Sequence, residues 1–219
     1  MLQVAASQVS CVLIIVSGSE EDVGTSREKP EVVVGNLIEI DDAIVLLLGT
    51  RVAGARPGEI QGITRLEKLV FLLERETSSK SWLSQDAGFE PYNFGPFSQK
   101  VYQAVDMLAA AQLIEDSSSP SPDVTDIWEQ REGIGLDTGS AGQSNDPYRT
   151  RDFRLTERGW KYFEALTREL PRGAVAELQQ FKRQFGFLPL RQLIRYVYTR
   201  YQEYTTKSVI RDEILGPNT

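Results

Sequence analysis

The segment from Phe89 to Ser98 constrains the fold most, because it reads as a short aromatic strand, a Gly-Pro turn and the start of a helix. Its aromatic residues favour an extended segment that packs on a core. The Gly-Pro pair favours a turn, and the Ser98 hydroxyl can cap a helix that begins directly after it. We therefore expect a structural motif that sets the entry angle of the next helix, formed by Tyr92, Phe94, Gly95, Pro96, Phe97 and Ser98.

Helices are predicted on both sides of this motif. Apolar residues at helical spacing predict a buried helix over residues 37 to 48 and a second one over 64 to 76. In the second, Thr64 and Glu67 have the spacing of a capping box. The third predicted helix, residues 98 to 112, has an apolar inner face and a polar outer face. These three helices are the framework on which the motif is placed.

The chain after residue 112 alternates between short strands and helices. A strand is expected from Leu113 and another over residues 153 to 156, where Thr156 can cap a helix that ends at Pro171. Between the two strands, residues 117 to 148 are rich in Ser, Gly, Pro and acidic residues, a composition typical of a flexible loop. Three further helices are expected, one before Gly186, one from Pro189 and a short one from Ser208.

The predicted fold is mainly α with a small β wing, in the α+β class. Its element order is that of a winged helix-turn-helix followed by a C-terminal helical extension, with residues 98 to 112 in the recognition position. We expect three regions: a poorly ordered N-terminal arm (1–35), a winged-helix domain (36–170) with a flexible acidic wing insertion (117–148), and the helical extension (171–219).

Four stretches carry a resemblance to known proteins: residues 64–73, 92–98, 153–159 and 204–208. Together they resemble the bacterial YwgA-like proteins and, more distantly, the Panacea domain of SocA-type antitoxins. The resemblance implies a non-enzymatic winged-helix fold in prokaryotic regulation or defence, and the Panacea domains imply binding of a protein partner. The chain departs from the family pattern in its arm and in its acidic loop.

Composition argues against most catalytic chemistry. The chain has no histidine and a single cysteine, Cys11, which excludes histidine triads, histidine metal ligands and multi-cysteine zinc sites. It also lacks a glycine-rich phosphate loop, and its adjacent acidic residues Asp41 and Asp42 point in different directions on a helix. We predict no catalytic residues, no metal site and no cofactor.

The N-terminal apolar run, residues 11 to 16, does not indicate a membrane protein. It is too short to cross a bilayer, and no Lys or Arg precedes it before Arg27, as a secretory signal would require. A lone cysteine is also consistent with a reducing compartment. We expect a cytoplasmic protein with no membrane partner.

Charge is divided unevenly along the chain. Residues 1 to 148 hold 10 basic and 23 acidic side chains, whereas residues 149 to 219 hold 14 basic and 8 acidic ones. A basic C-terminal part can be a nucleic-acid footprint, or it can neutralise the acidic part across an internal or subunit interface. The sequence leaves both interpretations open.

DNA binding is the preferred hypothesis. The outer face of the third helix would present Gln99, Lys100 and Gln103 to base edges. Eight acidic residues between 115 and 146 argue against it, because a wing carrying them repels phosphate. The candidate phosphate contacts are Arg149, Arg151, Arg154, Arg158 and Lys161.

The alternative hypothesis is an antitoxin-like or defence-accessory module that binds a protein. Trp128 could dock from the acidic loop, and the C-terminal part interleaves arginines with tyrosines, which is typical of protein interfaces as well as of packed helices. Under the preferred hypothesis the protein is a homodimeric regulator of prokaryotic transcription or phage defence. The candidate partner-binding residues are Trp128, Arg195, Tyr198 and Tyr204.

Overall fold

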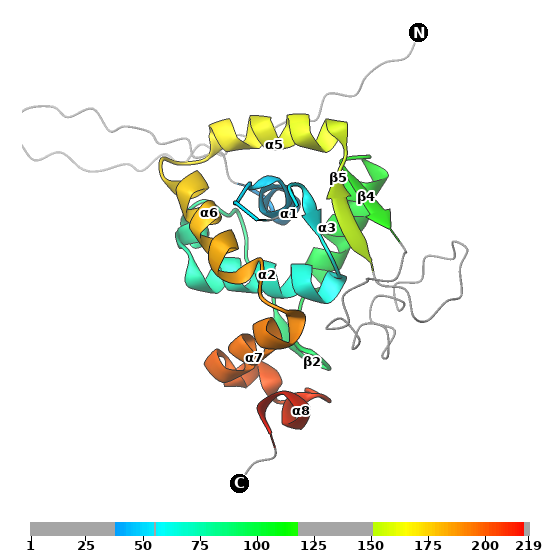
Figure 1. The fold of residues 1–219 in the computed structure, drawn as a ribbon, viewed down its shortest axis with the longest axis vertical. Coiled ribbons are helices and arrows are strands. Elements are labelled where there is room, and N and C mark those ends of the chain that lie inside the picture. Colours follow the sequence, from blue (N-terminus) through cyan, green and yellow to red (C-terminus); the bar gives the residue numbers. More distant parts are fainter. Residues whose placement is uncertain (1–37, 55, 118–150, 217–219) are drawn as a thin grey trace, which may run out of the picture. The chain divides into compact units, whose positions relative to one another are not determined.

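The computed structural model describes residues 38–54, 56–117 and 151–216. These residues form seven α-helices, a three-stranded antiparallel sheet and a two-stranded hairpin, which confirms the α+β class (Figure 1). The predicted arm and nearly all of the acidic insertion lie outside the described residues, as do Arg149 and Trp128.

The helices and strands are interspersed along the chain. In chain order they are α1 (Ile40–Gly49), β1 (Glu59–Ile60), α2 (Ile63–Glu76), the 3-10 helix η1 (Ser78–Ser81), β2 (Glu90–Tyr92), β3 (Gly95–Phe97), α3 (Gln99–Ala110), β4 (Ile114–Ser117), β5 (Asp152–Leu155), α5 (Glu157–Glu169), α6 (Ala174–Phe185), α7 (Leu190–Arg200), the 3-10 helix η3 (Gln202–Thr205) and α8 (Arg211–Leu215).

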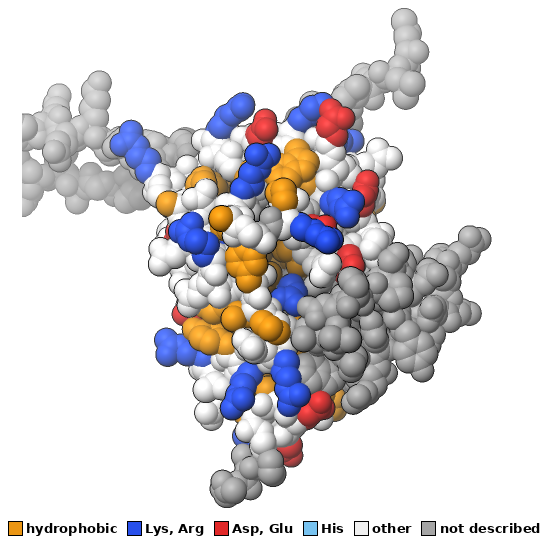
Figure 2. Space-filling model, viewed as in Figure 1, with side chains coloured by type: hydrophobic (Ala, Val, Ile, Leu, Met, Phe, Trp, Pro, Cys, Tyr) orange, Lys and Arg blue, Asp and Glu red, His pale blue; other side chains and the backbone are white. Residues whose placement is uncertain are grey.

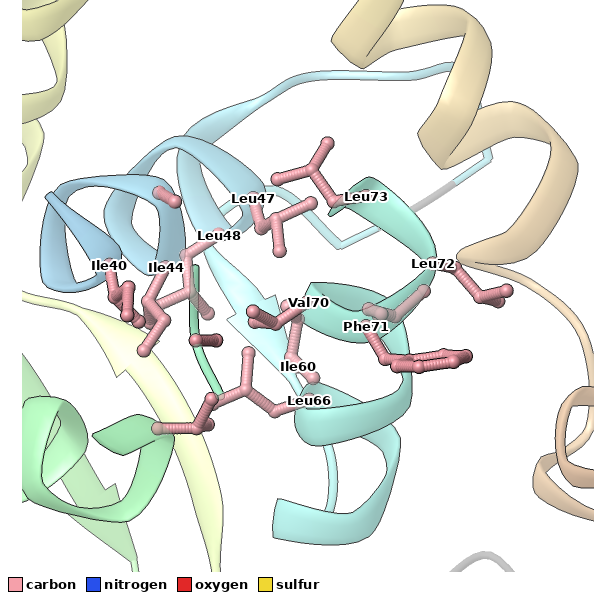
Figure 3. Packing of buried hydrophobic residues seen from close by; sticks show 14 of the residues in the cluster. Ile40, Ile44, Leu47, Leu48, Ile60, Leu66, Val70, Phe71, Leu72 and Leu73 are labelled. Atoms are coloured by element: carbon pink, nitrogen blue, oxygen red, sulfur yellow. The ribbon is translucent and has the colours of Figure 1, made fainter. Parts of the chain in front are cut away.

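Helix α1 is the centre of the core. It contacts α2, α3, α5, α6 and β5, which surround it in Figure 1. Val45 and Leu46 are as completely buried as Ile44 and Leu48, so the helix is covered on every side, as expected for the buried helix predicted in this stretch. A helix that is apolar all round is stable only when it is surrounded. Figure 3 shows Leu47 and Leu48 on the side of α1 that faces Leu66, Val70 and Leu73 of α2.

The C-terminal end of α1 is capped by a lysine from a distant helix. Lys182 of α6 is 5 % exposed, and its Nζ donates to the carbonyls of Leu47, Leu48 and Thr50 at 2.7, 3.0 and 2.9 Å. A positive charge at a helix C-terminus satisfies carbonyls that have no partner within the helix. Burial lowers the pKa of Lys182 to about 8, so most of the protein carries the charged form at neutral pH.

Replacing Lys182 with methionine should lower the free energy of unfolding by about 2 kcal/mol, because three buried carbonyls lose their donor. Urea unfolding followed by circular dichroism measures this change. The control is Arg183→Met, since Arg183 is the exposed neighbour on the same helix. Equal losses for the two variants would contradict the capping role.

Helix α2 is buried along almost its whole length, from Ile63 to Glu74. The predicted capping box at its start is wrong. The helix begins at Ile63 after Gly62, whose backbone N–H donates to Asp152 Oδ1 at 3.1 Å, and no side chain caps it. Glu67 turns instead towards the start of α3. A local motif is lost here because tertiary partners compete for the same carboxylate.

The three-stranded sheet has the order β1-β5-β4, with antiparallel pairs throughout. In β5, Phe153 and Leu155 are buried while Arg154 points outwards, which confirms the alternation predicted for a strand. Thr156 then caps α5, because its hydroxyl oxygen accepts a hydrogen bond from Gly159 N at 3.0 Å. The sheet therefore positions the start of α5 beside the end of α3.

The aromatic segment before α3 forms a hairpin. Tyr92 pairs with Gly95, so the turn falls at Asn93 and Phe94, and the prediction of a turn at Gly95 and Pro96 is wrong. Gly95 belongs to β3 with a φ of +90°, where its missing side chain leaves room for the Tyr198 ring. The predicted cap is confirmed, because Ser98 Oγ accepts from Val101 N at 3.3 Å.

The C-terminal helices are part of the same core as the N-terminal ones. Leu193, Ile194 and Val197 of α7 are fully buried, and α7 contacts α2 and β3. All described residues fall in one unit that runs from Gly35 to Thr219. Residues 171 to 216 thus complete the cover of α2.

Candidate interface around helix α3

The outer face of α3 is at the surface, as the predicted recognition role requires. Gln99, Lys100 and Gln103 are exposed, and Met107, one turn further along, is 64 % exposed. The opposite face is buried and consists of Val101, Tyr102, Ala104, Val105 and Leu108. The helix is therefore held firmly by its inner face, and its outer face is available for contact.

Lys100 is partly engaged within the protein. Its Nζ donates to the Asp86 carbonyl at 2.8 Å and to Gln85 Oε1 at 3.1 Å, which ties the loop before the hairpin to the first turn of α3. An ammonium group has three donors, so one N–H remains for a phosphate or a base edge. Lys100 can therefore contact a ligand from a fixed position.

Arg151 has a structural role. Its guanidinium donates to Asp106 Oδ1 of α3 at 2.7 Å and to Asp116 Oδ2 of β4 at 2.6 Å, and its side chain is 15 % exposed. Burial opposes the charge, but the hydrogen bonds and charges of the two aspartates outweigh it and raise the pKa of Arg151. The group joins the sheet to α3, which corrects its predicted assignment as a phosphate contact.

Three other predicted phosphate contacts are at the surface. Arg154 lies 3.5 Å from Glu59 and is 62 % exposed, Arg158 is exposed, and Lys161 forms an exposed pair with Glu157 at 2.7 Å. Exposed ion pairs contribute little free energy, so a phosphate can replace the carboxylate in them. Arg154, Arg158 and Lys161 remain candidates.

The described part of the chain is electrically balanced. It holds 20 basic and 20 acidic side chains, so the net charge of −7 comes entirely from residues outside it. Figure 2 shows Lys and Arg side chains scattered over one face, separated by apolar and other residues instead of forming a continuous basic patch. Asp106 and Glu115 are exposed near the C-terminal half of α3. On this face, a phosphate contact thus depends on separate cations.

The predicted partner-binding residues fall in different environments. Tyr198 is fully buried, and its hydroxyl lies 2.8 Å from Ser208 Oγ, so its assignment to a binding surface is wrong. Tyr204 is half-buried against Phe71 and accepts a hydrogen bond from Arg75 at 2.8 Å. Arg195 is exposed on α7. Of the described members of this set, only Arg195 is freely presented at the surface.

A buried polar network at the start of α3 is not predicted from the sequence. Lys68 Nζ donates to Glu67 Oε2 and to the Pro96 carbonyl, both at 2.8 Å, and Ser98 N donates to Glu67 Oε1 at 2.9 Å. Glu67 and Lys68 are 3 % and 1 % exposed. The only sequence signal is a Glu-Lys pair inside an otherwise apolar run, which also occurs on surface helices. The network fixes α3 relative to α2.

Within the described ranges, no group of three or more His, Cys, Asp or Glu side chains is arranged to hold a metal ion. In the same ranges, no helix has the length and apolar character needed to cross a bilayer. A scan against protein-family models gave no match, and searches of curated proteins and of solved structures gave no significant match. Function is therefore inferred from the residues of this chain.

Proposed function

We propose that the protein is a non-catalytic regulator with a winged-helix architecture that binds DNA through the outer face of α3. The observation that carries the proposal is the exposure of Gln99, Lys100 and Gln103 on one face of a helix whose inner face is anchored in the core. A glutamine side chain can form two hydrogen bonds with the edge of adenine, and a lysine can donate to guanine or to a phosphate.

The order of the elements supports this proposal. Apart from the 3-10 helix and the hairpin between α2 and α3, the order is a first helix, a short strand, two helices and two further strands, and β1 pairs with the outer edge of β5. In a winged helix this order places the third helix at the surface for the major groove. The stretch from Thr77 to Ser98 between α2 and α3 is longer than the turn of a simple helix-turn-helix, and it contains the hairpin.

The electrostatic contribution is expected to be modest. Lys100, Arg154, Arg158 and Lys161 are the exposed candidate cations near α3 and the start of α5. If all four contact phosphate, the logarithm of the binding constant should fall with the logarithm of the salt concentration at a slope of about −3.6. A protein held mainly by phosphate contacts has a steeper slope.

The double variant Gln99→Ala/Gln103→Ala should weaken binding to the protein's own upstream DNA by tenfold or more, since a bidentate contact contributes about 1–3 kcal/mol. Fluorescence anisotropy with a labelled duplex at low and moderate salt measures the loss. The matched control is Gln180→Ala/Gln184→Ala, an exposed pair with the same spacing on α6. Absence of binding at low salt, or equal affinity of both double variants, would reject the proposal.

A protein partner on the same face is the second candidate function. The balanced charge and the exposed Met107 favour it, because flexible apolar side chains are common on protein-binding surfaces. Met107→Glu should then abolish complex formation with a neighbouring gene product, as measured by co-purification of the two expressed chains.

We also propose that the protein is a homodimer. Light scattering after gel filtration measures the molar mass that tests this.

A further inference from the structure

A small pocket lies between the end of α2 and the loop that precedes the hairpin. Its volume is about 230 Å³, and its lining consists of Glu74, Lys80, Leu83, Gln85 and Asp86. It thus combines two carboxylates, an amide, a cation and one apolar wall. The pocket is large enough to hold more than a single water molecule.

Glu74 lines this pocket and carries an unsatisfied oxygen beneath its wall. The residue is 3 % exposed, and its Oε1 accepts a hydrogen bond from Ala87 N at 2.7 Å. Its Oε2 is buried and has no hydrogen-bond partner within the described residues. Buried carboxylate oxygens normally have a donor, because leaving one unpaired is costly. A ligand with an N–H donor would supply what the protein does not.

The pKa of Glu74 supports a role for a cationic ligand. Burial raises it to about 6, the hydrogen bond from Ala87 opposes this shift, and the nearby Asp86 charge adds to it. Arg75 and Lys80, the other charges that face the carboxyl group, lower it by smaller amounts. The carboxylate is thus mostly ionised above pH 6, and an approaching ammonium group would stabilise that form.

The remaining lining residues define the rest of the ligand. Gln85 Oε1 and the Asp86 carbonyl already accept hydrogen bonds from the Lys100 ammonium, so an amine in the pocket depends on the carboxylates of the lining for its acceptors. Lys80 is exposed and adds a positive charge to the same lining. A simple amine would be repelled by Lys80, whereas a molecule that also carries a carboxylate would be attracted by it.

We propose that this pocket binds a small α-amino acid, with the ammonium group on Glu74 and the carboxylate on Lys80. The inference goes beyond DNA binding and does not depend on it. The pocket also lies next to the start of α3, because Ser98 Oγ donates to the Ala87 carbonyl at 2.6 Å while Ala87 N donates to Glu74. An occupant of the pocket therefore contacts the loop that holds Ser98, the capping residue of α3.

Isothermal titration of the full chain with each of the common L-α-amino acids, up to roughly 10 mM, tests the proposal. At least one amino acid should bind. Its N-acetyl derivative and its amide should each bind with an affinity lower by about tenfold or more, since each loses one charge-assisted contact. Absence of binding by every amino acid overturns the proposal. Unchanged binding of the amide overturns the role of the carboxylate.

Glu74→Gln and Lys80→Met should each lower the affinity for the amino acid, measured by the same titration, by about tenfold. The Gln variant keeps an acceptor for Ala87 N and removes a buried charge, so it should fold, which circular dichroism checks. Glu90→Gln and Lys207→Met are the matched controls, because both residues are exposed and lie outside the pocket lining. Equal affinities of the Glu74 and Glu90 variants would overturn the site.

The pH dependence gives an independent readout. Only the carboxylate form of Glu74 attracts an ammonium group, so affinity should rise as the pH increases through about 6. Glu74→Gln should remove this rise. A wild-type affinity that stays constant between about pH 5 and 7.5 would contradict the assignment of the ammonium group to Glu74.

Discussion

Replacing Lys68 with methionine is expected to lower the free energy of unfolding by about 3–5 kcal/mol. Lys68 is 1 % exposed, and its ammonium group is the cation that neutralises the buried Glu67 carboxylate. Burial raises the pKa of Glu67, and the Lys68 charge and hydrogen bond act in the opposite direction. Without the lysine, a buried carboxylate keeps only the backbone donor from Ser98.

Urea unfolding followed by circular dichroism measures this loss. The double variant Glu67→Gln/Lys68→Met should recover most of it, because the amide carries no charge and its oxygen can still accept from Ser98 N. Lys161→Met is the exposed control, for which the free energy of unfolding should stay close to that of the wild type. If the single and double variants are equally unstable, the uncompensated charge is not the cause.

Gly95→Ala is the second substitution with a large expected effect, about 3 kcal/mol of unfolding free energy. Two costs combine at this position. The backbone has a φ of +90°, which side chains disfavour, and a Cβ atom would lie 2.6 Å from Tyr198 Cε1. The ring cannot move aside easily, since Tyr198 is fully buried and its hydroxyl lies against Ser208.

Gly173→Ala separates the two costs. Gly173 has a nearly identical φ of +91°, but no atom lies within 4 Å of the position that a Cβ atom would take there. This variant should lose only the conformational contribution, about 1–2 kcal/mol. Thermal unfolding of both variants gives the difference. Equal losses would mean that the contact between Gly95 and Tyr198 does not contribute.

The helices could be predicted because their signal is local. Apolar spacing predicts α2 and α3 closely, and Ser98 and Thr156 mark the starts of two helices as expected. The predicted turn at Gly95 and Pro96 is wrong, because the turn lies at Asn93 and Phe94. Gly95 is needed for a close contact with Tyr198, more than 100 positions later, and not for a turn. Long-range contacts of this kind leave no periodic trace in the sequence.

The candidate interface was predictable only in part, for the same reason. The exposure of Gln99, Lys100 and Gln103 follows from the apolar pattern on the opposite face of α3. The pairing of Arg151 with Asp106 and Asp116 spans up to 45 positions and could not be inferred from residue type. Arg151 would consequently be a poor probe of DNA binding, because its substitution breaks the link between α3 and the sheet.

The enclosed position of α1 has a consequence for synthesis on the ribosome. The helix is among the first described elements to be made, yet the lysine that caps it follows Leu47 by 135 positions. Until α6 has emerged, the nascent chain carries a strongly apolar segment without its complete cover. Such exposed segments are where chaperones bind and where unfinished chains associate. The order of translation thus leaves the centre of this protein incompletely covered until α6 has been made.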